Sequence, residues 1–150
     1  MRETSPKRRI VVAVTGASGS LYARLLCGRL AASEAVGEIA LIVTGIGRRV
    51  AAYEDRTDWM DDPRYTLYDD GDLFGAPASG SARYDAMAVV PCSMGMAGRI
   101  ASGVSDSLAS RAADVMLKER RRLVLVTREG PLGTGHPPNM TALSGSGAGV

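Results

Sequence analysis

The feature that most constrains the fold is a set of short apolar runs in which hydrophobic and polar residues do not alternate. Four such runs occur, at residues 10–14, 39–43, 86–90 and 123–126. They are built largely from valine, isoleucine, leucine and alanine, and a short uninterrupted run of this kind predicts a strand that is buried on both faces. Strands of this type belong to parallel sheets, whose crossovers are right-handed.

The segments between these runs have the periodicity of helices. Residues 21–32 place Leu21, Leu25, Leu26 and Leu30 on one side, and helices are also predicted over residues 47–54, 94–100 and, after a cap at Asp106 or Ser107, up to about Arg120. One or two helical turns are expected at residues 139–144. Alternating strands and helices predict a doubly wound α/β domain of the Rossmann or flavodoxin type, with a mostly parallel sheet in three α/β/α layers.

One stretch departs from this alternation. Residues 55–71 are rich in Asp, Tyr and Arg, contain Pro63 and show little periodicity, so we expect a long surface excursion or lid with some local structure. The whole chain has 150 residues, of which 45% are hydrophobic. That size and composition predict a single domain over residues 1–150.

The overall composition argues against several partners and cofactors. A net charge of +2 and an aromatic content of 5% disfavour nucleic acid as a ligand. A single histidine, His136, and two cysteines without metal-ligand spacing predict that no metal is bound. No apolar run approaches the ~20 residues of a membrane span and no secretory signal is visible, so we expect a cytoplasmic protein with no membrane partner.

In a doubly wound sheet, ligands bind beyond the carboxyl ends of the strands. Four segments follow the predicted strands, at residues 15–20, 44–45, 91–96 and 127–131. Because the strands are expected to be parallel, these segments should converge on one site.

The first segment, T-G-A-S-G-S at residues 15–20, suits a phosphate. Gly16 and Gly19 allow a tight turn, Ser18 and Ser20 carry hydroxyls, and the helix that follows offers free N–H groups and the positive end of its dipole. The loop lacks the lysine of a P-loop, which disfavours a nucleoside triphosphate. The alternative is a strand-to-helix turn that binds nothing.

Three further groups could carry chemistry, each with a structural alternative. Cys92 could be a nucleophile, but no histidine lies near it in the motif, and it could instead be packed inside. Arg128 could grip phosphate oxygens while Glu129 moves a proton, or the two could form a local ion pair. Arg111 and Lys118 share one helix face and could bind a second anion or be solvated.

Taken in order, these segments resemble one known family. T-G-A-S-G-S is followed by A-S-G-S, P-C-S, R-A-A-D-V-x-L-K-E-R-R and L-V-L-V-x-R-E-x-P-L. This order is similar to that of the UbiX/Pad family of flavin prenyltransferases, part of a wider group of homo-oligomeric flavoproteins that includes cysteine decarboxylases. The resemblance runs from about Arg9 to Val150. Residues 77–81, P-A-S-G-S, stand where cysteine decarboxylases have P-A-S-A-N-T, which favours the prenyltransferase branch.

The resemblance implies a function. Such enzymes bind reduced FMN and dimethylallyl phosphate, join the prenyl group to a nitrogen and then a carbon of the flavin, and pass prenylated FMN to a UbiD-type decarboxylase. They need no metal and assemble as trimers or dodecamers. The alternatives are an FMN-dependent decarboxylase of the cysteine-decarboxylase type and a non-catalytic FMN-binding subunit.

The resemblance also implies roles for individual residues. FMN contacts are expected from Gly16, Ala17, Ser18, Thr44, Ser93, Met94, Gly95, Met96 and Arg128, and contacts to dimethylallyl phosphate from Ser79, Gly80, Arg111 and Lys118, some of them from a neighbouring subunit. Glu54, Lys118 and Glu129 would form the catalytic group, with the glutamates handling protons or supporting the phosphate.

Three departures from the family pattern stand out. Members continue past this point through a strand and a final helix that supply a tyrosine and a basic residue, so we expect a domain without that C-terminal segment. Leu73 stands where some members have tryptophan, and Met94 and Met96 stand where small hydroxyl residues are common.

Overall fold

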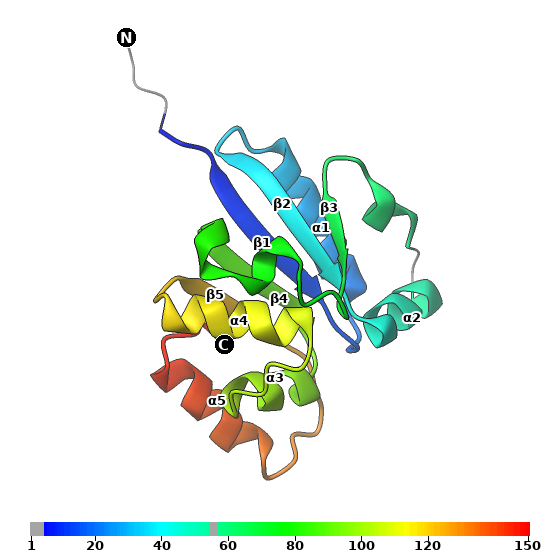
Figure 1. Cartoon of the computed structure of the whole chain (residues 1–150). Coiled ribbons are helices and arrows are strands. Elements are labelled where there is room, and N and C mark those ends of the chain that lie inside the picture. The colour runs from blue at the N-terminus through cyan, green and yellow to red at the C-terminus, as the bar shows by residue number, and fades with distance from the viewer. Residues whose placement is uncertain (1–4, 55–56) are drawn as a thin grey trace.

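The computed structural model describes residues 5–54 and 57–150 and contains one five-stranded sheet (Figure 1). Its strands are β1 (Arg8–Val14), β2 (Val36–Val43), β3 (Thr66–Asp69), β4 (Ala86–Cys92) and β5 (Arg122–Thr127). They are ordered β3-β2-β1-β4-β5, and every pairing is parallel. The expected doubly wound, three-layer architecture is confirmed.

Helices connect the strands and cover the sheet. They are α1 (Ser20–Ala32), α2 (Gly45–Glu54), α3 (Met94–Ala101), α4 (Leu108–Lys118) and α5 (His136–Gly145), with single turns η1 (Asp58–Asp61), η2 (Ala76–Ala78) and η3 (Gly80–Ala82). Ser107, not Asp106, caps α4, because its hydroxyl accepts the Ser110 amide and the Ser110 hydroxyl accepts the Ser107 amide. Among the described residues, no helix has both the length and the apolar character needed to cross a membrane.

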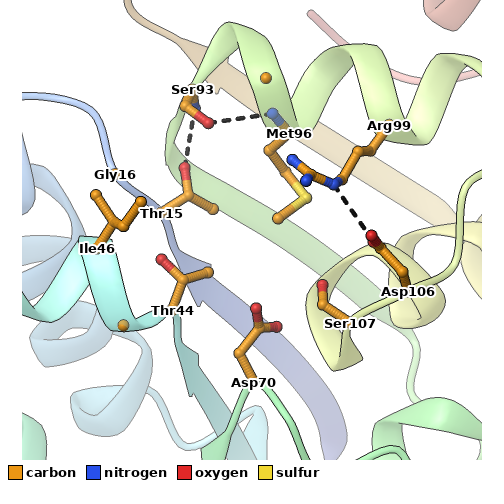
Figure 2. Close-up of a pocket in the computed structure, with 12 residues that line it drawn as sticks. Thr15, Gly16, Thr44, Ile46, Asp70, Ser93, Met96, Arg99, Asp106 and Ser107 are labelled. Atoms are coloured by element: carbon orange, nitrogen blue, oxygen red, sulfur yellow. Dashed lines mark hydrogen bonds and ion pairs between the residues drawn. The ribbon is translucent and has the colours of Figure 1, made fainter.

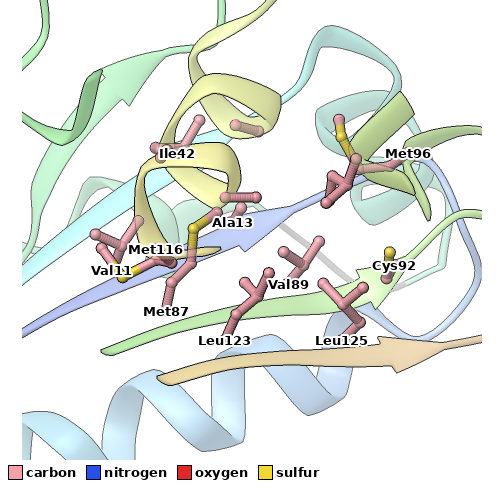
Figure 3. Close-up of a cluster of buried hydrophobic side chains, with 14 of the residues drawn as sticks. Val11, Ala13, Ile42, Met87, Val89, Cys92, Met96, Met116, Leu123 and Leu125 are labelled. Carbon is pink, nitrogen blue, oxygen red and sulfur yellow. The ribbon is translucent and has the colours of Figure 1, made fainter. Parts of the chain in front are cut away.

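Strand β1 contributes side chains to two core clusters, one on each face of the sheet. Val11 and Ala13 pack into a cluster with side chains of α3, α4 and α5 (Figure 3), whereas Val12 and Val14 pack into a second cluster with side chains of α1, α2 and η1. All four residues are fully buried. Alternate residues of β1 thus face opposite sides of the sheet, and helices cover both sides. A central strand of such a sheet has apolar residues at every position, which is why an unbroken apolar run predicts it.

The leucines of α1 form only part of the buried stripe that their spacing suggested. The buried residues of this helix are Ser20, Ala23 and Cys27, while Leu21 is 42% exposed and Leu25 is 53% exposed. Small side chains allow the helix to lie close to the sheet. Leu26 and Leu30 are partly buried and pack against the second core cluster, so the expected stripe is confirmed at two of its four leucines. Cys27 is fully buried in the core.

The expectation for residues 55–71 is wrong in part. Residues 55 and 56 lie outside the described ones, but beyond them η1 buries Met60 fully, and β3 pairs with β2 through Ala40 to Val43. A fifth strand therefore forms within the segment interpreted as a lid. Its sequence, T-L-Y-D, is mostly exposed at the sheet edge and lacks the continuous apolar run that marks the inner strands.

In β5, at the other edge of the sheet, buried and exposed residues alternate along the strand. Leu125 is 1% exposed and its neighbour Val126 is 43% exposed. We expect Leu125→Ala to lower the free energy of unfolding by roughly 2–5 kcal/mol, because it removes buried methyl groups and leaves a cavity. The control Val126→Ala should change it by no more than roughly 0.5 kcal/mol. Urea unfolding followed by circular dichroism measures both, and equal losses would contradict this division of the strand.

Candidate functional site

The segments that follow β1, β2, β4 and β5 converge at the carboxyl edge of the sheet, as expected. Two adjoining cavities lie there. The first has a volume of about 540 Å³ and is lined by Thr15, Gly16, Thr44, Gly45, Ile46, Asp70, Ser93, Gly95, Met96, Arg99, Asp106 and Ser107 (Figure 2). The second, of about 560 Å³, is lined by Gly16, Ala17, Ser18, Ser93, Arg128, Glu129 and Gly130. Both have the size of a small-molecule site, and they share Gly16 and Ser93.

Thr15 holds together the strand ends that form the shared wall. Its hydroxyl donates to the Pro91 carbonyl at 2.7 Å and accepts the Ser93 amide at 2.9 Å, and its side chain is almost fully buried. The Ser93 hydroxyl in turn accepts the Met96 amide at 3.1 Å and so caps α3 (Figure 2). No role was predicted for Thr15 itself; the only signal was its position at a strand end.

The wall between β1 and α2 has no room for a side chain at residue 16. An ideal Cβ on Gly16 would lie 2.5 Å from Ile46 Cγ2, well inside van der Waals contact. The absence of a side chain lets α2 approach and brings Ile46 to the first cavity. Thr44 begins this helix, since its hydroxyl accepts the Gly47 amide at 2.9 Å.

A carboxylate of the chain itself lies at the start of α1. Glu54 Oε2 accepts the Gly19 amide at 3.0 Å, the Ser20 amide at 3.3 Å and the Ser20 hydroxyl at 3.3 Å. These bonds, led by that from Gly19 and joined by one from the Ser18 hydroxyl, hold the pKa of Glu54 below its usual range. Glu54 therefore binds two of the amides that were expected to bind a phosphate, those of Gly19 and Ser20. The part of the loop that lines the second cavity is the turn at residues 16–18.

The second cavity carries one cation and one carboxylate. The Arg128 amide donates to the Cys92 carbonyl at 3.3 Å, which fixes its backbone beside β4, while its side chain is exposed. Glu129 accepts the amide of Gly130 at 3.1 Å. Among the described residues Arg128 and Glu129 form no ion pair with each other, so the guanidinium is available to an anion.

Residues from two other elements form the outer rim of the first cavity. Asp70 accepts the Ala109 amide at 2.8 Å and its own carbonyl accepts the Leu108 amide at 2.7 Å, so the end of β3 is attached to the start of α4. Arg99 and Asp106 form an ion pair of 3.3 Å across the rim (Figure 2), with about half of each side chain exposed. No site role was predicted for these three residues. Asp70 falls in the expected surface excursion and Arg99 in a short predicted helix, and Asp106 was expected only as a possible helix cap.

The structure sorts the expected site residues into groups. Gly16, Ala17, Ser18, Thr44, Ser93, Gly95, Met96, Arg128 and Glu129 line the two cavities. Met94, although expected to contact FMN, is buried and lines neither cavity. Cys92 is also buried, and burial raises the pKa of its thiol to about 12, so the thiolate needed for a nucleophile is disfavoured.

Four expected residues lie elsewhere. Ser79, Gly80, Arg111 and Lys118 line neither cavity and form a separate cluster around η3 and α4, here called the α4 cluster. Arg111 Nε donates to the Ala78 carbonyl at 3.2 Å, and Lys118 Nζ pairs with Glu119 at 2.5 Å. The two candidate anion sites predicted from the sequence are thus separate places within one copy of the chain.

Comparisons with known proteins agree with this geometry. A family model described as Flavoprotein matches residues 1–143. The flavin prenyltransferase UbiX of Archaeoglobus fulgidus is 44% identical over 146 residues, covering 93% of this chain and 77% of that protein. The crystal structure of AnUbiX (PadA1) in complex with FMN and dimethylallyl pyrophosphate is 41% identical, with a TM-score of 0.88 over 96% of this chain and 77% of the other.

An oligomeric protein is also similar. The dodecameric FMN-dependent Ubix-like decarboxylase from Escherichia coli O157:H7 is 37% identical, with a TM-score of 0.85, and the match covers 94% of this chain and 78% of that one. This chain therefore spans about three quarters of the length of each of these three proteins.

The contact of Glu54 with the first loop has a measurable pH dependence. A carboxyl whose pKa is lowered on folding stabilises the protein above its unfolded pKa of about 4.3, and the contribution is lost as the pH falls through the lowered folded value. We expect Glu54→Gln to lower the urea midpoint at pH 7, with a difference from wild type that shrinks below about pH 4. A difference that is constant from pH 7 to pH 3 would contradict this contact.

Proposed function

The chain belongs to the flavoprotein family and, within it, to the flavin prenyltransferases, and from this membership we propose that it transfers a dimethylallyl group from dimethylallyl phosphate to reduced FMN. One observation carries the proposal: two cavities of similar size meet at Gly16 and Ser93, and one of them presents Arg128, which forms no ion pair with any other described residue. Such a pair of spaces suits a molecule with a flat ring system at one end and a phosphate at the other.

The cavity walls fit FMN in their chemistry. Ile46 and Met96 give the first cavity apolar surface for a ring system, and the backbone at Gly16 forms its shared wall. Arg128 gives the second cavity a guanidinium, which suits phosphate oxygens, and the turn at residues 16–18 forms another part of its wall. We assign FMN binding to Gly16, Ala17, Ser18, Thr44, Ser93, Gly95, Met96 and Arg128. Bound in its reduced form, FMN supplies the nucleophilic ring atoms that receive the dimethylallyl group.

The α4 cluster supplies the cations for the prenyl donor. When the bond between the allylic carbon and the phosphate breaks, negative charge grows on the phosphate oxygens, and fixed cations and donors stabilise that charge. Arg111 and Lys118 are the cations of the cluster, and Ser79 adds a hydroxyl. The apolar walls at Ile46 and Met96 keep water away from the carbocation-like prenyl group.

Because the α4 cluster lies apart from the flavin cavities, the proposal includes assembly. We assign the α4 cluster of one copy to the flavin cavities of a neighbouring copy in a homo-oligomer. The dodecameric relative from Escherichia coli supports assembly of this fold. In a closed ring each copy then contributes to two sites, once through its cavities and once through its cluster.

Two carboxylates are placed to handle protons. Glu54 lies at the start of α1, where its Oε2 accepts the Ser20 hydroxyl. Glu129 lines the second cavity beside Arg128. We propose that one of these two carboxylates accepts the proton that is released when the prenyl group bonds to the second flavin atom and closes a new ring. We also propose that a UbiD-type decarboxylase receives the product. Free thiols at both cysteines support a cytoplasmic location.

Anaerobic incubation with reduced FMN and dimethylallyl phosphate, followed by mass spectrometry, tests the function directly. We expect the flavin to gain the mass of one dimethylallyl unit. Recovery of unmodified FMN from a protein that binds it would contradict prenyl transfer and support a non-catalytic subunit. Release of carbon dioxide from a cysteine-ended peptide would instead support a decarboxylase.

Mixing of variants tests whether sites are shared between copies. Lys118→Met leaves the flavin cavities intact, and Arg128→Met leaves the α4 cluster intact, so each homo-oligomer should lose most of its activity. Co-expression of the two should restore about a quarter of the sites by random assembly, because a site needs one intact cavity and one intact neighbouring cluster. Co-expression of Lys118→Met with Arg111→Met is the control and should restore none. No recovery in the first mixture would show that each site lies within one copy.

A further inference from the structure

The segment at residues 78–82 is held by an unusual arrangement of three arginines. Arg111 Nε donates to the Ala78 carbonyl at 3.2 Å, Arg121 Nη2 donates to the Gly80 carbonyl at 3.0 Å, and Arg9 Nη1 donates to the Ala82 carbonyl. The carbonyls of three alternate residues are thus each turned towards a guanidinium. The arginines come from α4, from the turn after α4 and from β1, so the segment is attached to three separate parts of the fold.

Carboxylates accompany each of these arginines. Arg9 pairs with Glu38 on β2 at 2.6 Å, and Arg111 pairs with Asp114 one helical turn further along α4 at 3.2 Å. Lys118 first, and Arg121 to a smaller degree, lower the pKa of Glu119. The Glu119 carboxylate also lies against the segment, since an ideal Cβ on Gly80 would be 2.8 Å from Glu119 Oε1.

The arrangement of the carbonyls decides what the segment offers to a ligand. Ser79 and Ser81 are exposed, and their hydroxyl oxygens lie 2.8 Å apart. Carbonyl oxygens repel an anion, whereas hydroxyl and amide groups donate hydrogen bonds to it. Because the guanidinium groups engage the carbonyls, the side of the segment that carries the hydroxyls is left for a phosphate.

Arg121 is poorly explained by stability alone. Its Nη1 atom is buried and has no hydrogen-bond partner among the described residues, and a buried unpaired donor is unfavourable. The Gly80 carbonyl also accepts the Arg83 amide at 3.2 Å, so it would keep a partner without Arg121. Replacement of Arg121 by an apolar residue of similar volume would remove this unpaired donor.

We propose that Arg121 is a positioning residue for the prenyl donor: by holding the Gly80 carbonyl, it presents the Ser79 and Ser81 hydroxyls to the donor's phosphate. This inference rests on the proposed function, because it assigns the phosphate to the α4 cluster. Arg121 itself does not contact the phosphate in this scheme. Its contribution is to fix the segment before binding, which reduces the ordering cost of association.

Arg121→Met and Arg121→Lys test the proposal, with Arg122→Met as the matched control, since Arg122 is the next residue and is exposed. With reduced FMN held saturating, we expect Arg121→Met to raise the KM for dimethylallyl phosphate about tenfold, equivalent to roughly 1.4 kcal/mol. Its kcat, FMN affinity and urea midpoint should stay close to wild type. Lysine keeps the charge but lacks the planar set of donors of a guanidinium, so the KM of Arg121→Lys should lie between those of wild type and Arg121→Met. Arg122→Met should match wild type.

Hydrogen exchange gives a readout that needs no turnover. The amides of residues 79–83 should exchange faster in Arg121→Met than in Arg122→Met, with no change in β1 or α1. A KM equal to that of Arg122→Met, unchanged exchange at residues 79–83, or a parallel loss of FMN affinity would each overturn the proposal. Failure of the proposed function is distinguishable, because wild-type protein would then form no prenylated flavin before any variant is compared.

Discussion

Burial of β1 on both faces is the constraint on which the rest of the structure depends. Val11 and Ala13 face one core, Val12 and Val14 face the other, and none of the four is accessible to solvent. A strand in this position needs a neighbour on each side and helices above and below, which β2, β4 and the connecting helices provide (Figure 1). All the strands then point the same way, so the loops that leave them gather at one edge. The Thr15 hydroxyl, bonded to Pro91 and Ser93, joins the two loops at the centre of that edge.

The site that results has two parts with different chemistry. The flavin cavities are made by loops and helix starts, where small residues allow close approach and backbone groups remain accessible. The α4 cluster is made by charged side chains on the surface of α4 and by a Ser-rich segment whose carbonyls are engaged by arginines. In the proposed assembly, a neighbouring copy brings the cations of the α4 cluster to the flavin, so they need not be buried inside a single chain, where unpaired charges would be costly.

Much of the fold was accessible from the sequence because the strong signals were local. Unbroken apolar runs located the three inner strands and the edge strand β5, and the start of α4 was narrowed to Asp106 or Ser107. The failures have physical reasons. Strand β3 pairs at an edge with little burial, so its four residues carry no apolar run. The fully buried positions of α1 are Ser20, Ala23 and Cys27, which are too small to stand out in a search for leucine spacing. Of the leucines, only Leu26 and Leu30 contact the core. Met94 follows Ser93 in sequence but turns into the core, because successive residues of a helix point about 100° apart.

The sequence by itself determined the fold class, the edge at which the loops meet and the residue types available there, since these follow from chain direction and from the alternation of strands and helices. It also determined the family, through motifs that are short and ordered. Tertiary structure alone decided which groups meet. Glu54 reaches the amides of Gly19 and Ser20 across more than thirty residues, and Arg9 reaches the Ala82 carbonyl across 73 residues. Such contacts depend on the angle and depth at which helices pack on the sheet, and those are set by the fit of buried side chains rather than by any local pattern.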